Sequence, residues 1–437
     1  MKNAISGFSK KTKSEKIDWL IATYFHDNPT AREILSSYEN SDQALQQLHD
    51  DFIENSISNF YLPLGVAPNF LINGENYVLP MVIEESSVVA AAAKTAKYWS
   101  ERGGFKTTLL GEEKVGQIHF IFKGDSDKLS RFIDEKKNDF IQELKPLTQK
   151  MEQRGGGIKS IELRNKTADI PHYFQLHLCF LTKDAMGANF INSCLEQLAD
   201  NVVAHIEQSE HFSVEEKKIE IVMSILSNYV PNCRVKAEVS CPIEALEKED
   251  GLTQREFAKK FVRAVQIAKV EPYRAVTHNK GIMNGVDAVV LATGNDFRAV
   301  EAGVHAFAAR DGQYRSLSSA YIKNDVFHFE IELPLAVGTV GGLTKLHPLV
   351  RWSLELLNNP NAAQLMELIT VAGLAQNFAA VRSLVTSGIQ KGHMKMHLLN
   401  ILNQLNATTA QKEAALIHFK TVAVSHAAVH SFLGLDQ

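Results

Sequence analysis

The chain is poor in the residues and motifs that mark several common kinds of binding site. It has four cysteines in 437 residues. Their spacing is neither that of a metal site nor that of a redox pair, so we predict buried, reduced thiols and no bound metal. No GxGxxG fingerprint and no Walker sequence occurs, which argues against a Rossmann or P-loop nucleotide site. The four cysteines are Cys179, Cys194, Cys233 and Cys241.

Neither charge nor hydrophobic runs point to a nucleic acid or a membrane. The 46 Lys and Arg residues nearly balance the 50 Asp and Glu residues, so the net charge of −4 gives no basic footprint for nucleic acid. The longest apolar runs, SSVVAAAA and VDAVVLATG, are much shorter than the roughly 20 residues that span a bilayer. The polar, lysine-rich N-terminal segment lacks the apolar core of a signal peptide. We therefore expect a cytoplasmic protein without a membrane partner.

Length and hydrophobic patterns predict an α+β protein with more than one domain. A chain of 437 residues exceeds the usual size of one domain. In its middle the pattern becomes strand, helix, two strands and helix, which is typical of a small ferredoxin-like, non-Rossmann domain with an antiparallel sheet. We predict that this domain is inserted into a large mixed α/β domain. The predicted segments are 1–111 (with helices within 14–58) and 222–380 for the large domain, 112–221 for the small domain and 381–437 for a helical tail.

Two stretches join a predicted strand to a predicted helix. EESS covers Glu84–Ser87, where the backbone N–H groups and dipole of the next helix favour an anion. DAMGAN covers Asp184–Asn189, where the small residues Gly187 and Ala188 would let a phosphate approach the backbone closely. On pattern alone, the simpler interpretation of each stretch is a helix cap without a ligand.

Two further stretches carry isolated charged or titratable side chains. Lys280 in HNKGIMNG and Asp296 in GND stand at the two ends of VDAVVLATG, which we predict to be a strand. Such a lysine is commonly exposed, but a buried one would need a carboxylate partner, for which Asp296 is the candidate. His393 and His397 are four residues apart, yet no HExxH pattern accompanies them, so surface histidines are the simpler interpretation.

Several long stretches together closely resemble class II 3-hydroxy-3-methylglutaryl-coenzyme A (HMG-CoA) reductases. They follow in order between residues 60 and 397 and are VLPMVIEESSVVAAAAKTAKYW, DAMGANFIN, PYRAVTHNKGIMNGVDAVVLATGNDFRAVEAG, LPLAVGTVGG and GLAQNFAAVRSLVTSGIQKGHM. The resemblance implies that two hydrides from NAD(P)H reduce HMG-CoA to mevalonate and free coenzyme A, in the mevalonate pathway. It also implies a large domain that binds the substrate, a small domain that binds the nucleotide, and a C-terminal flap.

The resemblance assigns catalytic roles to four residues. Glu85, rather than Glu84, matches the catalytic glutamate and would donate a proton during reduction. Protonated Lys280 would stabilise the oxyanion that forms when hydride reaches the carbonyl carbon. Asp296 would keep Lys280 charged and in place. His393, on a tail that can close, would protonate the departing coenzyme A thiolate.

The resemblance also assigns binding residues. Ser87, Arg274 and Asn284 match positions near the hydroxymethylglutaryl group, and the guanidinium of Arg274 suits the free carboxylate of the substrate. The stretch DAMGAN matches the loop that binds the nicotinamide nucleotide. Its residues are Asp184, Ala185, Met186, Gly187, Ala188 and Asn189.

We predict that NADPH is preferred, although NADH is possible. A ribose 2′-phosphate favours basic neighbours, whereas NAD selectivity commonly uses a carboxylate. The position that we judge equivalent to the family's selectivity residue, near Thr148, carries no acid. Lys145, Lys150 and Arg154 lie nearby in the sequence.

Family members are dimers or assemblies of dimers with the active site across the subunit interface. We expect the same here, with the helical stretches flanking EESS as candidate contacts. Two alternatives remain open: oxidation of mevalonate with NAD for catabolism, and a silent scaffold of the same fold. The second is disfavoured because all four matched catalytic residues are present.

Overall fold

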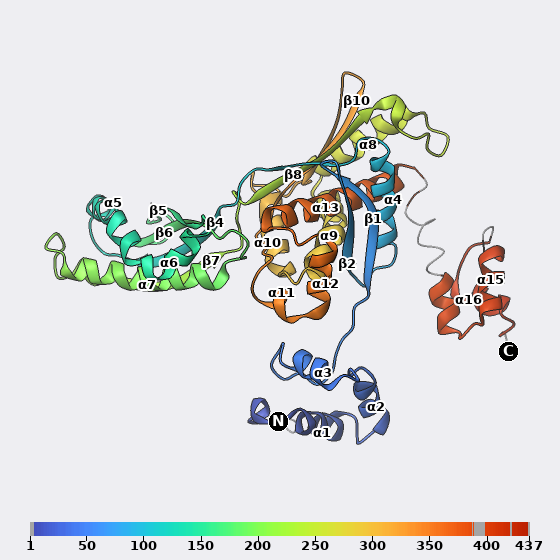
Figure 1. The fold of residues 1–437 in the computed structure, drawn as a ribbon, viewed down its shortest axis with the longest axis horizontal. Coiled ribbons are helices and arrows are strands. Elements are labelled where there is room, and N and C mark those ends of the chain that lie inside the picture. Colours follow the sequence, from blue (N-terminus) through green and yellow to red (C-terminus); the bar gives the residue numbers. More distant parts are fainter. Residues whose placement is uncertain (1–3, 387, 389–397, 420–421, 436–437) are drawn as a thin grey trace. The chain divides into compact units, whose positions relative to one another are not determined.

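The structure, a computed structural model, describes residues 4–386, 388, 398–419 and 422–435 (Figure 1). The chain divides into two compact units, Met1–Pro63 and Leu64–Gln437. All strands of the described residues belong to the second unit, which therefore carries both the sheets and the candidate site.

The N-terminal unit is a group of short helices. Thr12 caps the first long helix through a capping box with Glu15. The predicted helices are therefore confirmed, but the sequence predicts this segment to be part of the large domain. It is instead a unit of its own, because its buried residues Ile17 and Ile21 belong to none of the hydrophobic cores of the second unit. Its elements are η1 (Phe8–Lys10), α1 (Lys13–Tyr24), α2 (Pro29–Ser37) and α3 (Gln43–Asp50).

A hairpin and a four-stranded sheet form the β part of the large domain. Strands β1 (Leu64–Ile72) and β2 (Glu75–Val82) are joined at Asn73 and Gly74, whose φ angles of 50° and 90° give the left-handed turn that Asn-Gly favours. The sheet is antiparallel with the order β3-β8-β10-β9. Its strands are β3 (Lys106–Leu109), β8 (Arg234–Pro242), β9 (Ser318–Lys323) and β10 (Val326–Pro334).

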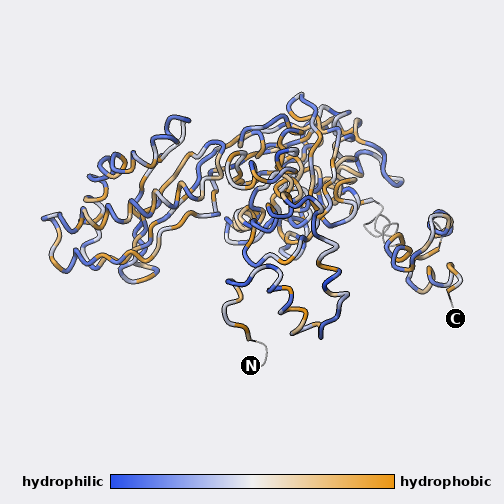
Figure 2. Tube along the Cα trace, turned by 60° about the horizontal axis from the view of Figure 1, so that its bottom comes forward, coloured by the Kyte–Doolittle hydropathy of each residue, from blue (hydrophilic) through white to orange (hydrophobic). Residues whose placement is uncertain are grey.

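The helices of the large domain pack around α13 (Ala362–Val385), which is buried along most of its length. It contacts α4, α8, α9 and the sheet, and hydrophobic residues concentrate in this interior (Figure 2). Among the described residues, α13 alone is long and apolar enough to cross a membrane. However, 72% of the qualifying window is buried inside the protein, as expected for a core helix. The other helices are α4 (Val88–Ser100), η2 (Ile243–Ala245), α8 (Gln254–Val270), α9 (Pro272–Ala292), α10 (Phe297–Ala308), α11 (Leu343–Leu346) and α12 (Pro348–Leu356).

Helix α9 corrects one prediction. The run VDAVVLATG, predicted to be a strand, forms the last turns of this helix and the residues that follow it. A short apolar run that is buried on all sides lacks a distinguishing period, so its sequence alone does not separate helix from strand. Val286, Val289 and Val290 are all buried, and packing of α9 against α13 selects the helix.

The small domain has a hydrophobic core of its own. Its antiparallel sheet has the order β5-β6-β4-β7, and the chain order of strands and helices gives a split β-α-β-β-α-β arrangement. The sequence predicts that the domain ends at residue 221, but β7 continues to Ser227. No residue of this edge strand is fully buried, and its apolar residues Val222, Met223 and Ile225 are exposed, so the strand does not show the usual alternation of a half-buried strand. The elements are β4 (Lys114–Ile121), α5 (Ser126–Glu143), α6 (Lys145–Glu152), β5 (Gly157–Asn165), β6 (Tyr173–Leu181), α7 (Ala188–Gln208) and β7 (Glu220–Ser227).

The C-terminal segment is helical where it is described. Helices α15 (Thr409–His418) and α16 (His426–Phe432) bury a small third core that includes Leu402 and Val429. Helix α13 ends at Val385, inside the segment 381–437 that the sequence assigns to the tail.

Gly285 allows α9 and α13 to approach closely. A Cβ atom on Gly285 would lie 2.3 Å from the carbonyl oxygen of Ala372, whereas one on Gly281, a turn earlier, would meet only the Cβ of Ala380 at 3.8 Å. We expect Gly285→Ala to lower the free energy of unfolding by about 1–3 kcal/mol, because the helices must move apart. Gly281→Ala is the matched control and should raise it by roughly 0.5–1 kcal/mol, since alanine favours a helix. Chemical denaturation measures both, and equal stability of the two variants would contradict the close contact.

Candidate functional site

Glu85 and Lys280 form an ion pair between two elements of the large domain. Lys280 Nζ lies 2.6 Å from Glu85 Oε2, and Asn284 Nδ2 donates to the same oxygen at 3.3 Å. Glu85 belongs to the turn between β2 and α4, while Lys280 and Asn284 are one turn apart on α9 and share a face. The structure thus brings together three site residues that are distant in the sequence.

The Glu85–Lys280 pair is exposed to solvent in the single chain. The side chain of Lys280 is 59% exposed and that of Glu85 is 36% exposed. Water screens such a pair, so it contributes little to the free energy of folding. The hypothesis of a buried Lys280 is therefore wrong for the isolated chain, and this lysine is not held there by core packing.

Ser87 occupies an unusual backbone conformation at the start of α4. Its φ of 76° is left-handed, and its side chain forms no cap hydrogen bond, so the prediction of a serine cap is wrong. A non-glycine residue in this region costs about 1–3 kcal/mol, and such strain is common at ligand-binding sites. The exposed hydroxyl of Ser87 remains available to another partner.

Arg274, in the first turn of α9, is a half-buried cation. Among the described residues, its guanidinium has neither an ion pair nor a hydrogen-bond acceptor. Burial lowers the pKa of Arg274 from its ordinary value. A partly buried charge without a partner is unfavourable, so this position suits an anionic ligand.

Asp296 does not pair with Lys280 within this chain, contrary to the prediction. Its carboxylate caps α10 by accepting the backbone N–H groups of Arg298 and Ala299, and it forms an ion pair with Arg298 at 3.0 Å. The reason is the length of the intervening segment. The part of α9 between Lys280 and Ala292 rises about 18 Å at 1.5 Å per residue, so the two side chains stand at opposite ends of it.

His393 and His397 lie outside the described residues. The proton-donor role of His393 and the surface position of His397 stay predictions.

The stretch DAMGAN connects β6 to α7 and is held on two sides. The carboxylate of Asp184 accepts the backbone N–H of Ala362 at 2.9 Å, and its carbonyl accepts that of Thr339 at 2.8 Å. Gly338 allows this contact, because a Cβ there would stand 2.4 Å from the backbone nitrogen of Met186. The residues that precede α7 therefore lie beside the glycine-containing segment LPLAVGTVGG of the large domain.

A cavity of about 820 Å³ opens beside this loop. Three cations line it, Arg154, Lys183 and Lys345, together with the acids Glu112 and Asp184. Lys183 and Lys345 were not predicted from the sequence. Lys183 directly precedes DAMGAN and Lys345 closely follows the glycine pair of VGTVGG, so their places in the sequence could have indicated a role at this loop. The excess of cations makes the cavity suitable for phosphate groups.

The structure corrects the prediction about Thr148. This residue is buried and its hydroxyl donates to Glu152 at 2.8 Å, while Lys145 pairs with the same carboxylate. The buried hydroxyl of Thr148 is therefore not available to a ribose phosphate, and Lys145, which pairs with Glu152, does not line the cavity. Of the basic residues predicted there, Arg154 lines the cavity and Lys150 does not.

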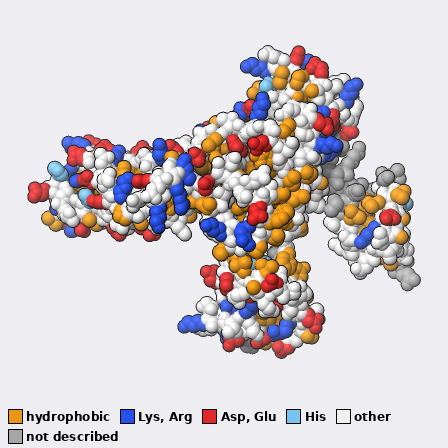
Figure 3. All heavy atoms as spheres, in the orientation of Figure 1, with side chains coloured by type: hydrophobic (Ala, Val, Ile, Leu, Met, Phe, Trp, Pro, Cys, Tyr) orange, Lys and Arg blue, Asp and Glu red, His pale blue; other side chains and the backbone are white. Residues whose placement is uncertain are grey.

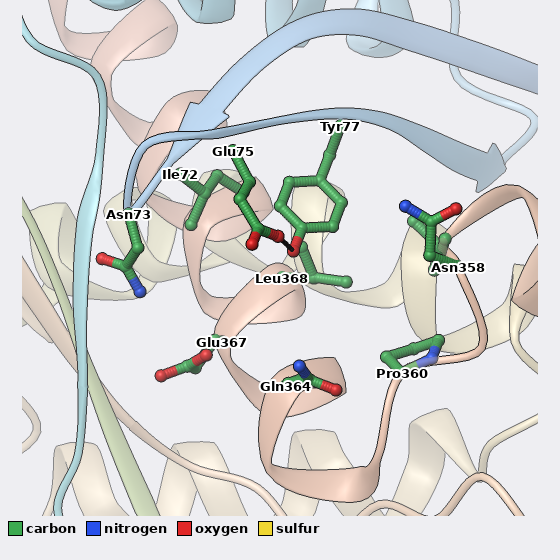
Figure 4. Close-up of a pocket in the computed structure, with 10 residues that line it drawn as sticks. Ile72, Asn73, Glu75, Tyr77, Asn358, Pro360, Gln364, Glu367 and Leu368 are labelled. Atoms are coloured by element: carbon green, nitrogen blue, oxygen red, sulfur yellow. Dashed lines mark hydrogen bonds between the residues drawn. The ribbon is translucent and has the colours of Figure 1, made fainter.

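A second cavity, of about 230 Å³, lies between the β1–β2 turn and the start of α13 (Figure 4). Glu75 accepts a hydrogen bond from Tyr77 at 2.7 Å, which raises the pKa of Tyr77 to about 12. Glu367, on α13, is half-buried, and its burial raises its pKa. No residue predicted for the site lines this cavity.

Comparison with known proteins relates the whole arrangement to one family. Residues 17–398 match the family described as hydroxymethylglutaryl-coenzyme A reductase. A 3-hydroxy-3-methylglutaryl-coenzyme A reductase from Archaeoglobus fulgidus is 36% identical over 410 residues, covering 93% of this chain and 88% of that protein. A probable reductase of the same name from Borreliella burgdorferi is 36% identical over 387 residues, covering 86% of this chain and 85% of that protein. The class II reductase of Streptococcus pneumoniae, solved with bound NADPH in open conformations, superimposes with a TM-score of 0.72 at 36% identity, covering 87% of this chain and all of that chain.

Asp287 and Glu301 form a pair of carboxyl groups outside the residues predicted from the sequence. Asp287 follows Asn284 by one turn of α9, and its Oδ1 is buried without a hydrogen-bond partner. Burial, together with a hydrogen bond to Glu301 of α10, raises the pKa of Asp287 to about 8. At neutral pH we therefore expect Asp287 to be protonated and to share its proton with Glu301.

This shared proton should make folding stability depend on pH. The native pKa of Asp287 lies above its unfolded value near 4, so the native state binds an extra proton between about pH 4 and pH 8. The stabilising effect of this proton is complete below about pH 4 and is lost as the pH rises from about 4 to 8. We expect Asp287→Asn to gain unfolding free energy relative to the wild type as pH increases from about 5 to 9. Denaturation at several pH values, with exposed Asp200→Asn as control, measures this, and parallel profiles for all three proteins would refute the shared proton.

Proposed function

Since the chain belongs to the hydroxymethylglutaryl-coenzyme A reductase family, we propose that the Glu85–Lys280 pair is the centre at which HMG-CoA is reduced. The observation that carries this proposal is the 2.6 Å contact between the two side chains, with Asn284 on the same carboxylate oxygen. Two molecules of NADPH each give one hydride. With two protons, the thioester becomes a hemithioacetal, then an aldehyde and free coenzyme A, and finally mevalonate.

Lys280 is the residue that stabilises negative charge on the reacting oxygen. An ammonium has three N–H donors, of which one is directed to Glu85. The others remain for the carbonyl oxygen of the substrate as hydride adds to the carbon. A cation that is already in place requires no reorganisation at that moment, which is the main advantage of a preorganised site.

Glu85 is the acid that supplies the proton. In its ion pair with Lys280 the side chain of Glu85 is a carboxylate, so it first takes up a proton from solvent and then donates that proton to the new alkoxide, which lies beside Lys280. His393 keeps the role that the resemblance gives it, as proton donor to the coenzyme A thiolate.

Arg274, Ser87 and Asn284 bind the hydroxymethylglutaryl group. The unpaired guanidinium of Arg274 binds the free carboxylate of the substrate, because its planar fork can donate hydrogen bonds to both oxygens. Ser87, with its hydroxyl left out of the helix cap, can donate to or accept from the substrate.

A second copy of the chain completes the centre. The exposed end of α8 and face of α9 carry apolar side chains, with Val270 68% exposed, Tyr273 88% and Val276 54%. Apolar side chains also gather over β1, β2 and α12, including Val66 and Trp352 (Figure 3). Exposed apolar surface of this kind marks an interface. In a homodimer, Asp296 of one chain could reach Lys280 of the other, which the length of α9 prevents within one chain, and the contact would reduce the exposure of the site.

The DAMGAN loop and the adjacent cavity bind NADPH, and the protein acts in the cytoplasm. The small domain thus serves as the nucleotide-binding domain, inserted within the substrate-binding domain. Three cations on the cavity wall support binding of phosphate groups, and Arg154 is the candidate for the 2′-phosphate. The S. pneumoniae reductase with similar structure was solved with NADPH bound.

Substitutions in the ion pair should abolish activity without unfolding the protein. We expect Lys280→Met and Glu85→Gln each to reduce kcat by about 10²-fold or more, because the oxyanion loses its cation or the reaction loses its acid. Arg274→Gln should mainly raise KM for HMG-CoA. Consumption of NADPH, followed by absorbance, measures both, with exposed Lys97→Met of α4 as the control. A wild-type protein that consumes neither cofactor would refute the function, and Lys280→Met with the rate of Lys97→Met would refute the role of Lys280.

Cofactor preference should depend on Arg154. We expect the wild type to prefer NADPH to NADH at equal concentrations. Arg154→Gln should weaken the binding of NADPH by roughly tenfold or more, because a hydrogen bond to a charged group is worth about 1.5–3 kcal/mol. It should leave the binding of NADH unchanged. Lys150→Gln, in the same segment but away from the cavity, is the control. A clear NADH preference of the wild type would overturn the assignment and would favour oxidation of mevalonate instead.

A further inference from the structure

Lys114 is a buried lysine with no ion pair in the part of the chain that the structure describes. It is the first residue of β4, and 5% of its surface is exposed. Its Nζ donates to Thr182 Oγ1 at 2.6 Å and to the carbonyl oxygen of Ala185 at 2.8 Å. Both acceptors are neutral, so they offset only part of the cost of removing a charge from water.

The charged and titratable groups near Lys114 come from three segments. Glu112 precedes β4, Asp184 belongs to the DAMGAN loop, and Cys233 precedes β8. The two acids have other partners: Glu112 lies 3.8 Å from Lys183, and Asp184 accepts the backbone N–H of Ala362. Burial raises the pKa of Cys233 to about 11, so it is a neutral thiol at neutral pH. Burial also lowers the pKa of Lys114, and a further negative charge nearby would stabilise its protonated form.

The two acceptors of Lys114 belong to the wall of the 820 Å³ cavity. Thr182 Oγ1 also donates to the carbonyl of Ala185 at 2.7 Å, so the three groups form a closed set of hydrogen bonds. Gly187 packs on the same threonine, because a Cβ there would lie 2.5 Å from Thr182 Cγ2. Lys114 thereby fixes the turn from which α7 begins, while remaining behind the cavity wall.

We propose that Lys114 is a positioning residue for the nucleotide loop and that its charge strengthens binding of the cofactor phosphates. The proposal rests on the proposed function, which places NADPH at this loop. The hydrogen bonds to Thr182 and Ala185 hold the backbone N–H groups at the start of α7 in place. The ammonium acts on the phosphates through the loop, since a buried charge is poorly screened by water.

Binding of NADPH to the full-length protein, followed by fluorescence or calorimetry, tests this role. We expect Lys114→Met to weaken NADPH binding by about tenfold to a hundredfold at neutral pH, which corresponds to loss of hydrogen bonds from a charged group. KM for HMG-CoA should be unchanged, because that substrate binds elsewhere. Lys159→Met, on the exposed part of β5, is the control and should bind NADPH like the wild type.

The pH dependence separates a role of the charge from a purely structural one. Wild-type affinity for NADPH should fall as pH rises past the pKa of Lys114, because phosphate binds the protonated form more tightly. Lys114→Met should lack this step, and Thr182→Val should move it to lower pH, since the ammonium loses an acceptor. Thr182→Val also decides the matter if Lys114→Met does not fold. The proposal would be overturned if the pH-dependent fall in NADPH affinity occurred at the same pH in Thr182→Val as in the wild type. It would also be overturned if Lys114→Met and Lys159→Met bound NADPH equally tightly. In both cases the reductase activity of the wild type would be unaffected. Absence of NADPH binding by the wild type would instead overturn the proposed function.

Discussion

The close packing of α9 against α13 is the contact on which the large domain and its site both depend. Gly285 of α9 faces the backbone of Ala372, and Gly373 of α13 faces Val286 and Ile282. Side chains larger than hydrogen at these positions would separate the helices, and the dense core around them leaves little room to adjust. Because one side of α9 is committed to this contact, its other side faces outward, and it carries the polar groups of the candidate centre.

This arrangement fixes the positions of the charges but leaves them exposed to water. The Glu85–Lys280 pair joins α9 to the β2–α4 turn, yet Lys280 is largely exposed and Glu85 is partly exposed to solvent. In water a charge pair at contact distance contributes about 1 kcal/mol, and its effect grows several-fold when solvent is excluded. The chain alone therefore supplies the geometry of the candidate site, and low-dielectric surroundings have to come from groups that bind over it.

The sequence predicted the elements whose patterns are local and failed where tertiary contacts decide. The alternating strands and long amphipathic helices of the small domain follow directly from periodicity. The second half of α9 did not, because Val286, Val289 and Val290 are buried on all sides and β-branched residues favour strands. The expected contact of Asp296 with Lys280 does not depend on that error, because a strand would separate the two residues even further than the helix does. The burial of Thr148 is likewise not visible in a basic stretch of sequence, and the NADPH preference inferred there stays a prediction.

The family resemblance predicts which residues meet the substrate, whereas burial points to residues that hold the supporting elements. Lys114 and Asp287 are charged or titratable side chains that the motifs do not single out, and each lies where two elements join: Lys114 beneath the nucleotide loop, and Asp287 between α9 and α10. Exposed charges such as Lys280 can exchange water for substrate at little cost, but a buried ionisable group ties its protonation to the geometry around it. Under the proposed function, exposed charges therefore serve the chemistry and buried ones keep the supporting elements in register.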